Sequence, residues 1–130
     1  MKRAAILYFT DRGAATAERI QSALQGAWKV SLHRPRGGER SVVEALFSSV
    51  DALIFVGACG IAVRAIAPFV RSKTTDPAVI VVDELGRQAI SLLSGHIGGA
   101  NALTRRIAAD VGAIPVITTA TDLSLSLIHI

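Results

Sequence analysis

The sequence has little cysteine, few aromatic residues and no long hydrophobic run. Cys59 is the single cysteine among 130 residues, which excludes an internal disulfide and any cysteine-based zinc site. Aromatic residues make up 5% of the chain, so the core has to be built from Ala, Val, Ile and Leu. No window approaches the roughly 18 uninterrupted apolar residues of a membrane span. We therefore expect a cytoplasmic protein without a membrane partner.

Charge is also sparse, and its distribution limits the choice of partner. Charged residues make up 18% and hydrophobic residues 51%, which is typical of a packed domain and not of a disordered chain. The net charge is +4, and most of the cations are arginines scattered along the chain without a run or stripe. Such a set suits a small polyanion at least as well as nucleic acid. A nucleotide- or nucleic-acid-binding domain is the alternative that the pI of about 10.0 suggests, and we expect no nucleic-acid partner.

Apolar runs alternate with segments of helical periodicity. The patterns predict strands at residues 4–9, 28–33, 52–56, 78–82, 87–93 and 114–118, and helices at 14–24, 41–49, 61–70 and 100–111. Ser41 and Glu44 have the spacing of a capping box, Pro68 should end or kink its helix, and "TDRG" is predicted to be a turn. The order indicates one α/β domain: a mainly parallel open sheet, helices on both faces, and one antiparallel hairpin at "DELG".

Three glycine-bearing loops lead from a predicted strand into a predicted helix, at residues 10–16, 57–64 and 94–101. In open parallel sheets ligands bind at such positions, where a helix N-terminus offers unpaired N–H groups and a positive dipole to an anion. None of the loops matches the dinucleotide fingerprint, the P-loop or the nucleophile elbow. Tight turns need glycine for steric reasons as well, so each loop is equally well explained as a plain turn.

Several polar side chains near these loops are candidates for chemistry. His96 lies between glycines and exchanges a proton near neutral pH, although a histidine that bonds to backbone explains it as well. Asp83 and Glu84 follow a buried strand and suit either a general base or hairpin-turn hydrogen bonding. Three cations, Arg64, Arg71 and Lys73, either hold carboxylates or cover a solvated face. No second histidine or carboxylate stands at metal-ligand spacing from His96, so we expect no metal site built by the protein.

The second half of the chain resembles a known family. The motifs "VRAIAP", "K-x-x-DPAV", "VVDE-x-G", "SLLSGHIGGAN" and "PVITTATD" follow one another within residues 60–122. In this order they resemble the N-terminal region of the cobalamin-biosynthesis family CbiG, the cobalt-precorrin-5A hydrolases. The resemblance implies hydrolysis of the substrate's δ-lactone with loss of acetaldehyde, which gives cobalt-precorrin-5B. It also implies that cobalt belongs to the corrinoid substrate, so no cofactor of the protein is expected.

The implied chemistry assigns roles to the candidates. Lactone opening needs an activated water, a stabilised oxyanion and a proton for the leaving oxygen. We expect His96 to share the acid–base work with Asp83 or Glu84. Backbone N–H groups of Gly98 and Gly99 would bind the oxyanion or a carboxylate. The remaining expected substrate-binding residues are Gly57, Gly60, Arg64, Lys73, Ser94, Gly95 and Asn101.

The end of the sequence departs from the family pattern. We expect residues 1–122 to form the CbiG-like domain and 123–130 to be a non-native tail, because "LSLIHI" (125–130) equals the translation of a transposon mosaic-end adapter. Family members continue into a C-terminal domain, which we expect as the missing partner of this chain. The alternative to a hydrolase is a non-catalytic corrinoid-binding or assembly module that needs that domain. Assembly into a homo-oligomer is left open.

Overall fold

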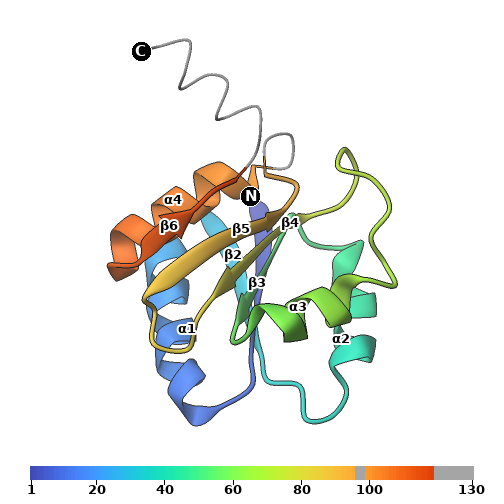
Figure 1. Cartoon of the computed structure of the whole chain (residues 1–130), viewed down its shortest axis with the longest axis horizontal. Helices are drawn as coiled ribbons and strands as arrows, with labels where there is room; N and C mark the ends of the chain where they lie inside the picture. The colour runs from blue at the N-terminus through green and yellow to red at the C-terminus, as the bar shows by residue number, and fades with distance from the viewer. Residues whose placement is uncertain (96–98, 119–130) are drawn as a thin grey trace.

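The fold is a six-stranded sheet between two pairs of helices (Figure 1). The computed structural model describes residues 1–95 and 99–118. Along the chain the elements are β1 (Lys2–Tyr8), α1 (Asp11–Leu24), β2 (Trp28–His33), α2 (Glu39–Phe47), β3 (Ala52–Val56), α3 (Cys59–Ile66), β4 (Ala78–Val82), β5 (Gln88–Leu93), α4 (Ala100–Val111) and β6 (Ile114–Val116). This order confirms the predicted alternation of strands and helices.

The strands lie in the order β2-β1-β3-β4-β5-β6. β1 to β4 are parallel, with Ile54 of β3 paired to Ile6 of β1 on one side and to Ile80 of β4 on the other. Every residue of β3 and β4 is buried, because both strands are interior and helices cover both faces of the sheet. This explains why "ALIFV" and "AVIVV" are apolar without alternation. The predicted α/β class with a mainly parallel sheet is confirmed.

Successive strand residues point to opposite faces and build two cores. Ile6 and Ile54 pack beneath α1 and α4, whereas Leu7 and Phe55 pack beneath α2 and α3. Figure 1 shows these two helix pairs on opposite sides of the sheet. All four side chains are fully buried, and burying an Ile, Leu or Phe stabilises a fold by about 1.5–3 kcal/mol. The central strands therefore hold both helical layers in place.

The second half of the sheet reverses direction. β5 pairs antiparallel with β4, as the hairpin prediction required, and β6 pairs parallel with β5. We call the edge where β1, β3 and β4 end the carboxyl edge, and the edge where they begin the amino edge. Since β5 runs the other way, it starts at the carboxyl edge and ends at the amino edge. In Figure 1 the amino edge is at the top and the carboxyl edge at the bottom.

Helix α1 begins earlier than its apolar pattern predicts. Thr10 is its N-cap, and the Thr10 Oγ1 atom accepts a hydrogen bond of 3.0 Å from the Gly13 N–H. Asp11 adds a negative charge in the first turn, which favours the positive end of the helix dipole. The predicted turn "TDRG" is therefore wrong: it forms the cap and first residues of the helix.

Helices α2 and α3 also differ from the predicted bounds. α2 begins at Glu39 after Gly38, so Ser41 lies inside the helix and the predicted capping box is wrong. α3 ends at Ile66, two residues before Pro68, whose ring cannot continue a helix. The chain between α3 and β4 is therefore a long loop at the amino edge.

Candidate functional site

The predicted site residues fall into two groups at opposite edges of the sheet. Those at the carboxyl edge are Gly57, Gly60, Arg64, Asp83 and Glu84, and those at the amino edge are Lys73, Ser94, Gly95, Gly99 and Asn101. A strand of five or six residues is about 17–20 Å long, so the two groups do not meet. The prediction of three equivalent loops is wrong for 94–101, because β5 ends at the amino edge. Two further predicted residues, His96 and Gly98, lie outside the described residues, as do 119–130.

At the carboxyl edge, α3 starts directly after β3. The Gly57 N–H donates a hydrogen bond of 2.9 Å to the Val82 carbonyl, so this residue extends the bonding between β3 and β4. Gly60 is exposed in the first turn of α3, and the Arg64 Nη1 atom lies 3.4 Å from the point where a Cβ at Gly60 would stand. The side chain of Arg64 therefore folds back toward the start of its own helix, over a residue that leaves room for it.

The carboxylates of Asp83 and Glu84 accept hydrogen bonds from the protein. Glu84 Oε1 accepts a bond of 3.0 Å from Thr10 Oγ1, which ties the β4–β5 turn to the start of α1. Asp83 accepts bonds of 2.6–3.3 Å from three backbone N–H groups of the turn, those of Leu85, Arg87 and Gln88. The Asp83 contacts are the hairpin-turn hydrogen bonding that the sequence offered as the alternative to catalysis, whereas the Glu84 contact joins the turn to another element.

At the amino edge, the chain leaving β5 bends back onto the start of α4. Ser94 has φ +60°, a left-handed conformation that residues with a side chain rarely adopt. The carbonyls of Ser94 and Gly95 accept hydrogen bonds of 3.2 and 2.9 Å from the N–H groups of Ala100 and Asn101. The prediction that this helix N-terminus offers unpaired N–H groups is therefore wrong for these two residues. Asn101 is buried, and its Oδ1 atom accepts a 2.6 Å bond from Ser91 Oγ.

Gly99 is the N-cap of α4 and has φ +84°. This region of backbone conformation favours glycine, because a Cβ would be strained there. No atom of the described residues stands within 4 Å of the position that its Cβ would occupy. Backbone geometry alone therefore explains the glycine, and its role toward a substrate stays a prediction.

The loop between α3 and β4 is organised by Asp76. This carboxylate is 9% exposed, and its Oδ2 atom accepts hydrogen bonds of 2.9 and 3.1 Å from the N–H groups of Arg71 and Ser72. Ser94 Oγ donates a bond of 3.4 Å to the Asp76 carbonyl, so the loop contacts the chain that leaves β5. Lys73 is exposed on the same loop. The amino edge thus brings together Lys73 and the described part of 94–101.

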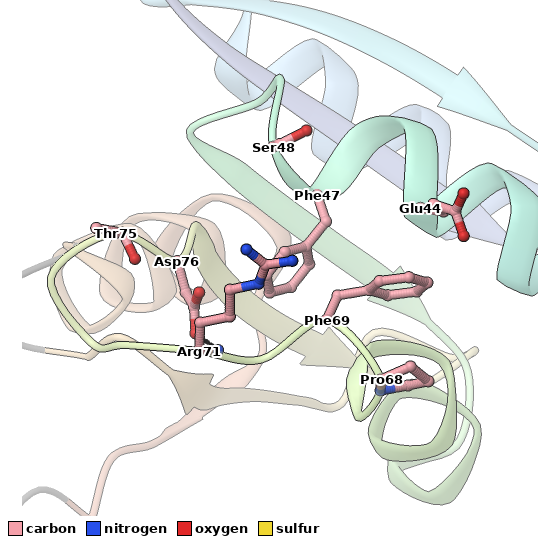
Figure 2. A pocket seen from close by; sticks show the side chains of 8 residues that line it. All are labelled: Glu44, Phe47, Ser48, Pro68, Phe69, Arg71, Thr75 and Asp76. Carbon is pink, nitrogen blue, oxygen red and sulfur yellow. Dashed lines mark hydrogen bonds between the residues drawn. The ribbon is translucent and has the colours of Figure 1, made fainter.

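A cavity of about 650 Å³ opens beside this loop, between α2 and the chain that follows α3 (Figure 2). The rings of Phe47 and Phe69 lie 6.1 Å apart, tilted by 41°. The lining residues are Glu44, Phe47, Ser48, Pro68, Phe69, Arg71, Thr75 and Asp76. Sequence reasoning considered only Arg71 among them for binding. The two phenylalanines have the pattern of core residues, whereas Pro68 and Asp76 belong to the motifs "VRAIAP" and "K-x-x-DPAV" without any sign there of a cavity.

Among the described residues, one pKa departs clearly from its ordinary value. Burial lowers the pKa of His33 below 6.5, because partly desolvated surroundings disfavour the charged imidazolium. The His33 Nε2 atom lies 2.8 Å from Ser31 Oγ on the same edge strand. His33 ends β2 at the carboxyl edge, beside Leu7 of β1. It is therefore remote from the amino edge.

The described ranges 1–95 and 99–118 contain neither a membrane-spanning helix nor a cluster of metal ligands. No helix there is both long and apolar enough to cross a bilayer. In the same part of the chain, no three His, Cys, Asp or Glu side chains gather in a way that would hold a metal ion. The expectation of a protein without its own metal or cofactor stays a prediction.

Comparison with known proteins gives the family. Residues 41–122, more than half of the chain, match the family described as "Cobalamin synthesis G N-terminal". The chain is 59% identical over 88 residues to a cobalt-precorrin-5A hydrolase of Salmonella typhimurium, which covers 68% of this chain and 25% of that protein. It is 54% identical over 86 residues to a cobalt-precorrin-5A hydrolase of Priestia megaterium, which covers 66% of this chain and 23% of that protein.

A solved structure has the same fold. It is a cobalamin biosynthesis protein G homologue from Sulfolobus solfataricus, with a TM-score of 0.78 and 27% sequence identity, covering 93% of this chain and 39% of that one. The chain matches about a quarter of the length of the two curated relatives. The resemblance noted in the sequence is confirmed by these matches. The chain belongs to the cobalamin synthesis G N-terminal family.

Proposed function

We propose that this chain is the N-terminal part of a cobalt-precorrin-5A hydrolase. The observation that carries the proposal is the name and 54–59% identity of the two curated relatives. The reaction opens the δ-lactone of cobalt-precorrin-5A, releases acetaldehyde and leaves cobalt-precorrin-5B. The partner of the chain is then a C-terminal domain of the same protein, the location is the cytoplasm, and the cobalt is part of the substrate.

The amino edge is the face that suits such a substrate. A corrinoid precursor carries acetate and propionate arms, and guanidinium and ammonium groups bind carboxylates through charge-assisted hydrogen bonds. Arg71 and Lys73 stand exposed on one loop at this edge, and the Ser94–Asp76 bond joins that loop to the chain after β5. The carboxyl edge also holds a cation, Arg64, but it is less suitable because Glu84 and Asp83 add two carboxylates there.

The proposed chemical roles follow from the separation of the predicted residues between the amino edge and the carboxyl edge. Water attacks the lactone carbonyl, the carbonyl oxygen becomes an oxyanion, and the ring oxygen leaves as an alkoxide. The alkoxide collapses to the carbonyl of acetaldehyde while its carbon–carbon bond to the macrocycle breaks, and the electron pair left on the macrocycle takes up a proton. In our proposal His96 supplies or removes that proton, and backbone N–H groups of Gly98 and Gly99 bind the oxyanion. Asp83 and Glu84 hold the β4–β5 turn against α1 and do not take part.

A second candidate is a corrinoid-binding module that supplies no catalytic group. One observation favours it. The two carboxylates that the sequence predicts to be catalytic, those of Asp83 and Glu84, accept hydrogen bonds from the protein and lie at the opposite edge of the sheet from Ser94. In that case the acid–base groups come from the C-terminal domain, and this domain only holds the substrate.

Turnover by the intact protein separates the two candidates. Under anaerobic conditions, acetaldehyde release from cobalt-precorrin-5A would be measured for the intact protein, for this chain alone and for intact His96→Ala. We expect turnover by the intact protein and a loss of about 100-fold or more in kcat for His96→Ala, since general acid–base catalysis contributes about 10²–10⁴-fold.

A control variant and two outcomes separate the hydrolase from the binding module. Arg12→Gln in the intact protein removes an exposed charge from α1 and should leave turnover unchanged. Full activity of His96→Ala would remove His96 from the mechanism and favour the binding module. Absence of turnover in the intact wild-type protein would refute the hydrolase.

A further inference from the structure

We propose that the cavity between α2 and the α3–β4 loop is a subsite for one carboxylate-bearing arm of the ligand, with Arg71 as its ion-pair partner. No comparison assigns a role to this cavity, and the inference rests on the proposed function for the identity of the ligand. The lining indicates the chemistry: around a space of about 650 Å³ lie one arginine with no ion pair among the described residues, two aromatic rings, two hydroxyl groups and the carboxylates of Glu44 and Asp76.

The cation is held toward the cavity by its backbone. Buried Asp76 fixes the Arg71 N–H at 2.9 Å, while Figure 2 shows the Arg71 side chain extending from the loop toward Phe47. Within the described residues, no ion pair or side-chain hydrogen bond of the Arg71 guanidinium is present. Asp76 is the nearest acidic residue along the loop, and its Oδ2 atom already serves two N–H groups. The guanidinium is therefore available for an outside anion.

The aromatic residues give the cavity an apolar wall. Phe47 is 8% exposed and packs in the core beneath α2, whereas Phe69 is half-buried and tilts against it at 6.1 Å. A ligand that carries only charge, such as a small inorganic anion, gains nothing from these rings. A short aliphatic arm that ends in a carboxylate uses both, since its methylene groups lie against the rings and its charge meets Arg71.

The polar residues at the rim of the cavity favour an arm whose carboxylate lies at the Arg71 end. Thr75 and Ser48 offer exposed hydroxyl groups at the rim. Glu44 projects from α2 and is set well apart from Arg71 in Figure 2, beyond the Phe69 ring. A carboxylate is therefore favoured at the Arg71 end and disfavoured at the Glu44 end, which fixes the direction of the arm. The volume lies within the usual range of about 300–1,000 Å³ for small-molecule sites.

The test is a binding titration with a stable corrinoid. Cobyrinic acid has acetate and propionate arms but no lactone, so it binds without being consumed. Its dissociation constant would be measured calorimetrically for this chain and for Arg71→Gln, Arg71→Lys and Phe69→Leu. We expect Arg71→Gln to weaken binding about 10-fold or more, Arg71→Lys to weaken it less, and Phe69→Leu to weaken it measurably. Amide resonances of residues 69–76 should shift on titration.

The control is Arg12→Gln, which removes the same charge from the opposite edge and should bind as the wild type does. Equal weakening by Arg12→Gln and Arg71→Gln would overturn the subsite, because the effect would be one of net charge. Unchanged affinity of Arg71→Gln in a well-folded sample, no binding to the wild type, or full competition by inorganic phosphate would also overturn it. Retained turnover by the intact Arg71→Gln protein at saturating substrate leaves the hydrolase proposal standing even when the subsite fails.

Discussion

His33 gives the fold a pH dependence that belongs to a single residue. Its pKa is lowered in the folded state by burial, whereas the unfolded chain takes up the proton near the ordinary value of 6.5. Below that pH the unfolded state binds more protons, so the free energy of unfolding falls as the pH falls and levels off below the folded-state pKa. The charged form is thus destabilising, and the effect is absent at higher pH.

The variant His33→Asn should lose this part of the pH dependence. Urea unfolding would be measured for wild type and variant at about pH 7.5 and about pH 5.5, on either side of the ordinary histidine pKa. We expect the difference in stability between the two pH values to be smaller in the variant. Identical pH dependence in both proteins would show that His33 is not the responsible group.

Residue roles were only partly predictable from the sequence. The sequence indicates that Asp83 and Glu84 follow a buried strand, but not that their carboxylates accept bonds from the turn and from Thr10. Such bonds depend on how the turn and α1 lie in space. The same holds for Asp76, whose two N–H donors are close in sequence but whose contact with Ser94 joins distant segments.

At the scale of elements, the β4–β5 turn depends on one carboxylate. Asp83→Ala removes the acceptor of three N–H groups and should lower the free energy of unfolding by about 1–2 kcal/mol, because each net hydrogen bond contributes about 0.5–1.5 kcal/mol and the groups are partly hydrated. Chemical denaturation of the wild type and of Asp83→Ala would measure this change in the free energy of unfolding.

The matched control is Asp110→Ala on α4, whose carboxylate lies 4.0 Å from Arg106 on the surface. It should change stability by less than about 0.5 kcal/mol, since exposed ion pairs contribute little. Asp83→Asn keeps one side-chain oxygen and should fall between the two. An Asp83→Ala variant with an unchanged free energy of unfolding would contradict the stabilising role of Asp83 in this turn.

Strands were easier to predict than helix starts. The runs 52–56 and 78–82 are apolar throughout because both faces of the sheet are covered, and the structure confirms their bounds. α2 starts after Gly38, which has no side chain to signal a cap, so sequence reasoning moved the start to Ser41. At α1 the signal was present in Thr10, but the polar first turn obscured it.

At the scale of the whole molecule, strand direction determines where a site can form. In doubly wound sheets, ligands usually bind at the carboxyl ends of the parallel strands. Here β5 turns back, so the segment after it and the Asp76 loop meet at the amino edge. The sequence predicts the antiparallel hairpin, but the prediction placed residues 94–101 with the other two loops, whereas the reversed β5 puts them at the amino edge.

We propose that the corrinoid lies on the amino edge of the sheet. Hydrogen exchange of the intact protein with and without cobyrinic acid tests it most directly. We expect slower exchange in residues 67–77, where the Asp76 loop and the cavity lie, and no change in 57–64 or 83–87. Protection of 57–64 and 83–87 with unchanged exchange in 67–77 would place the ligand on the carboxyl edge and contradict the claim.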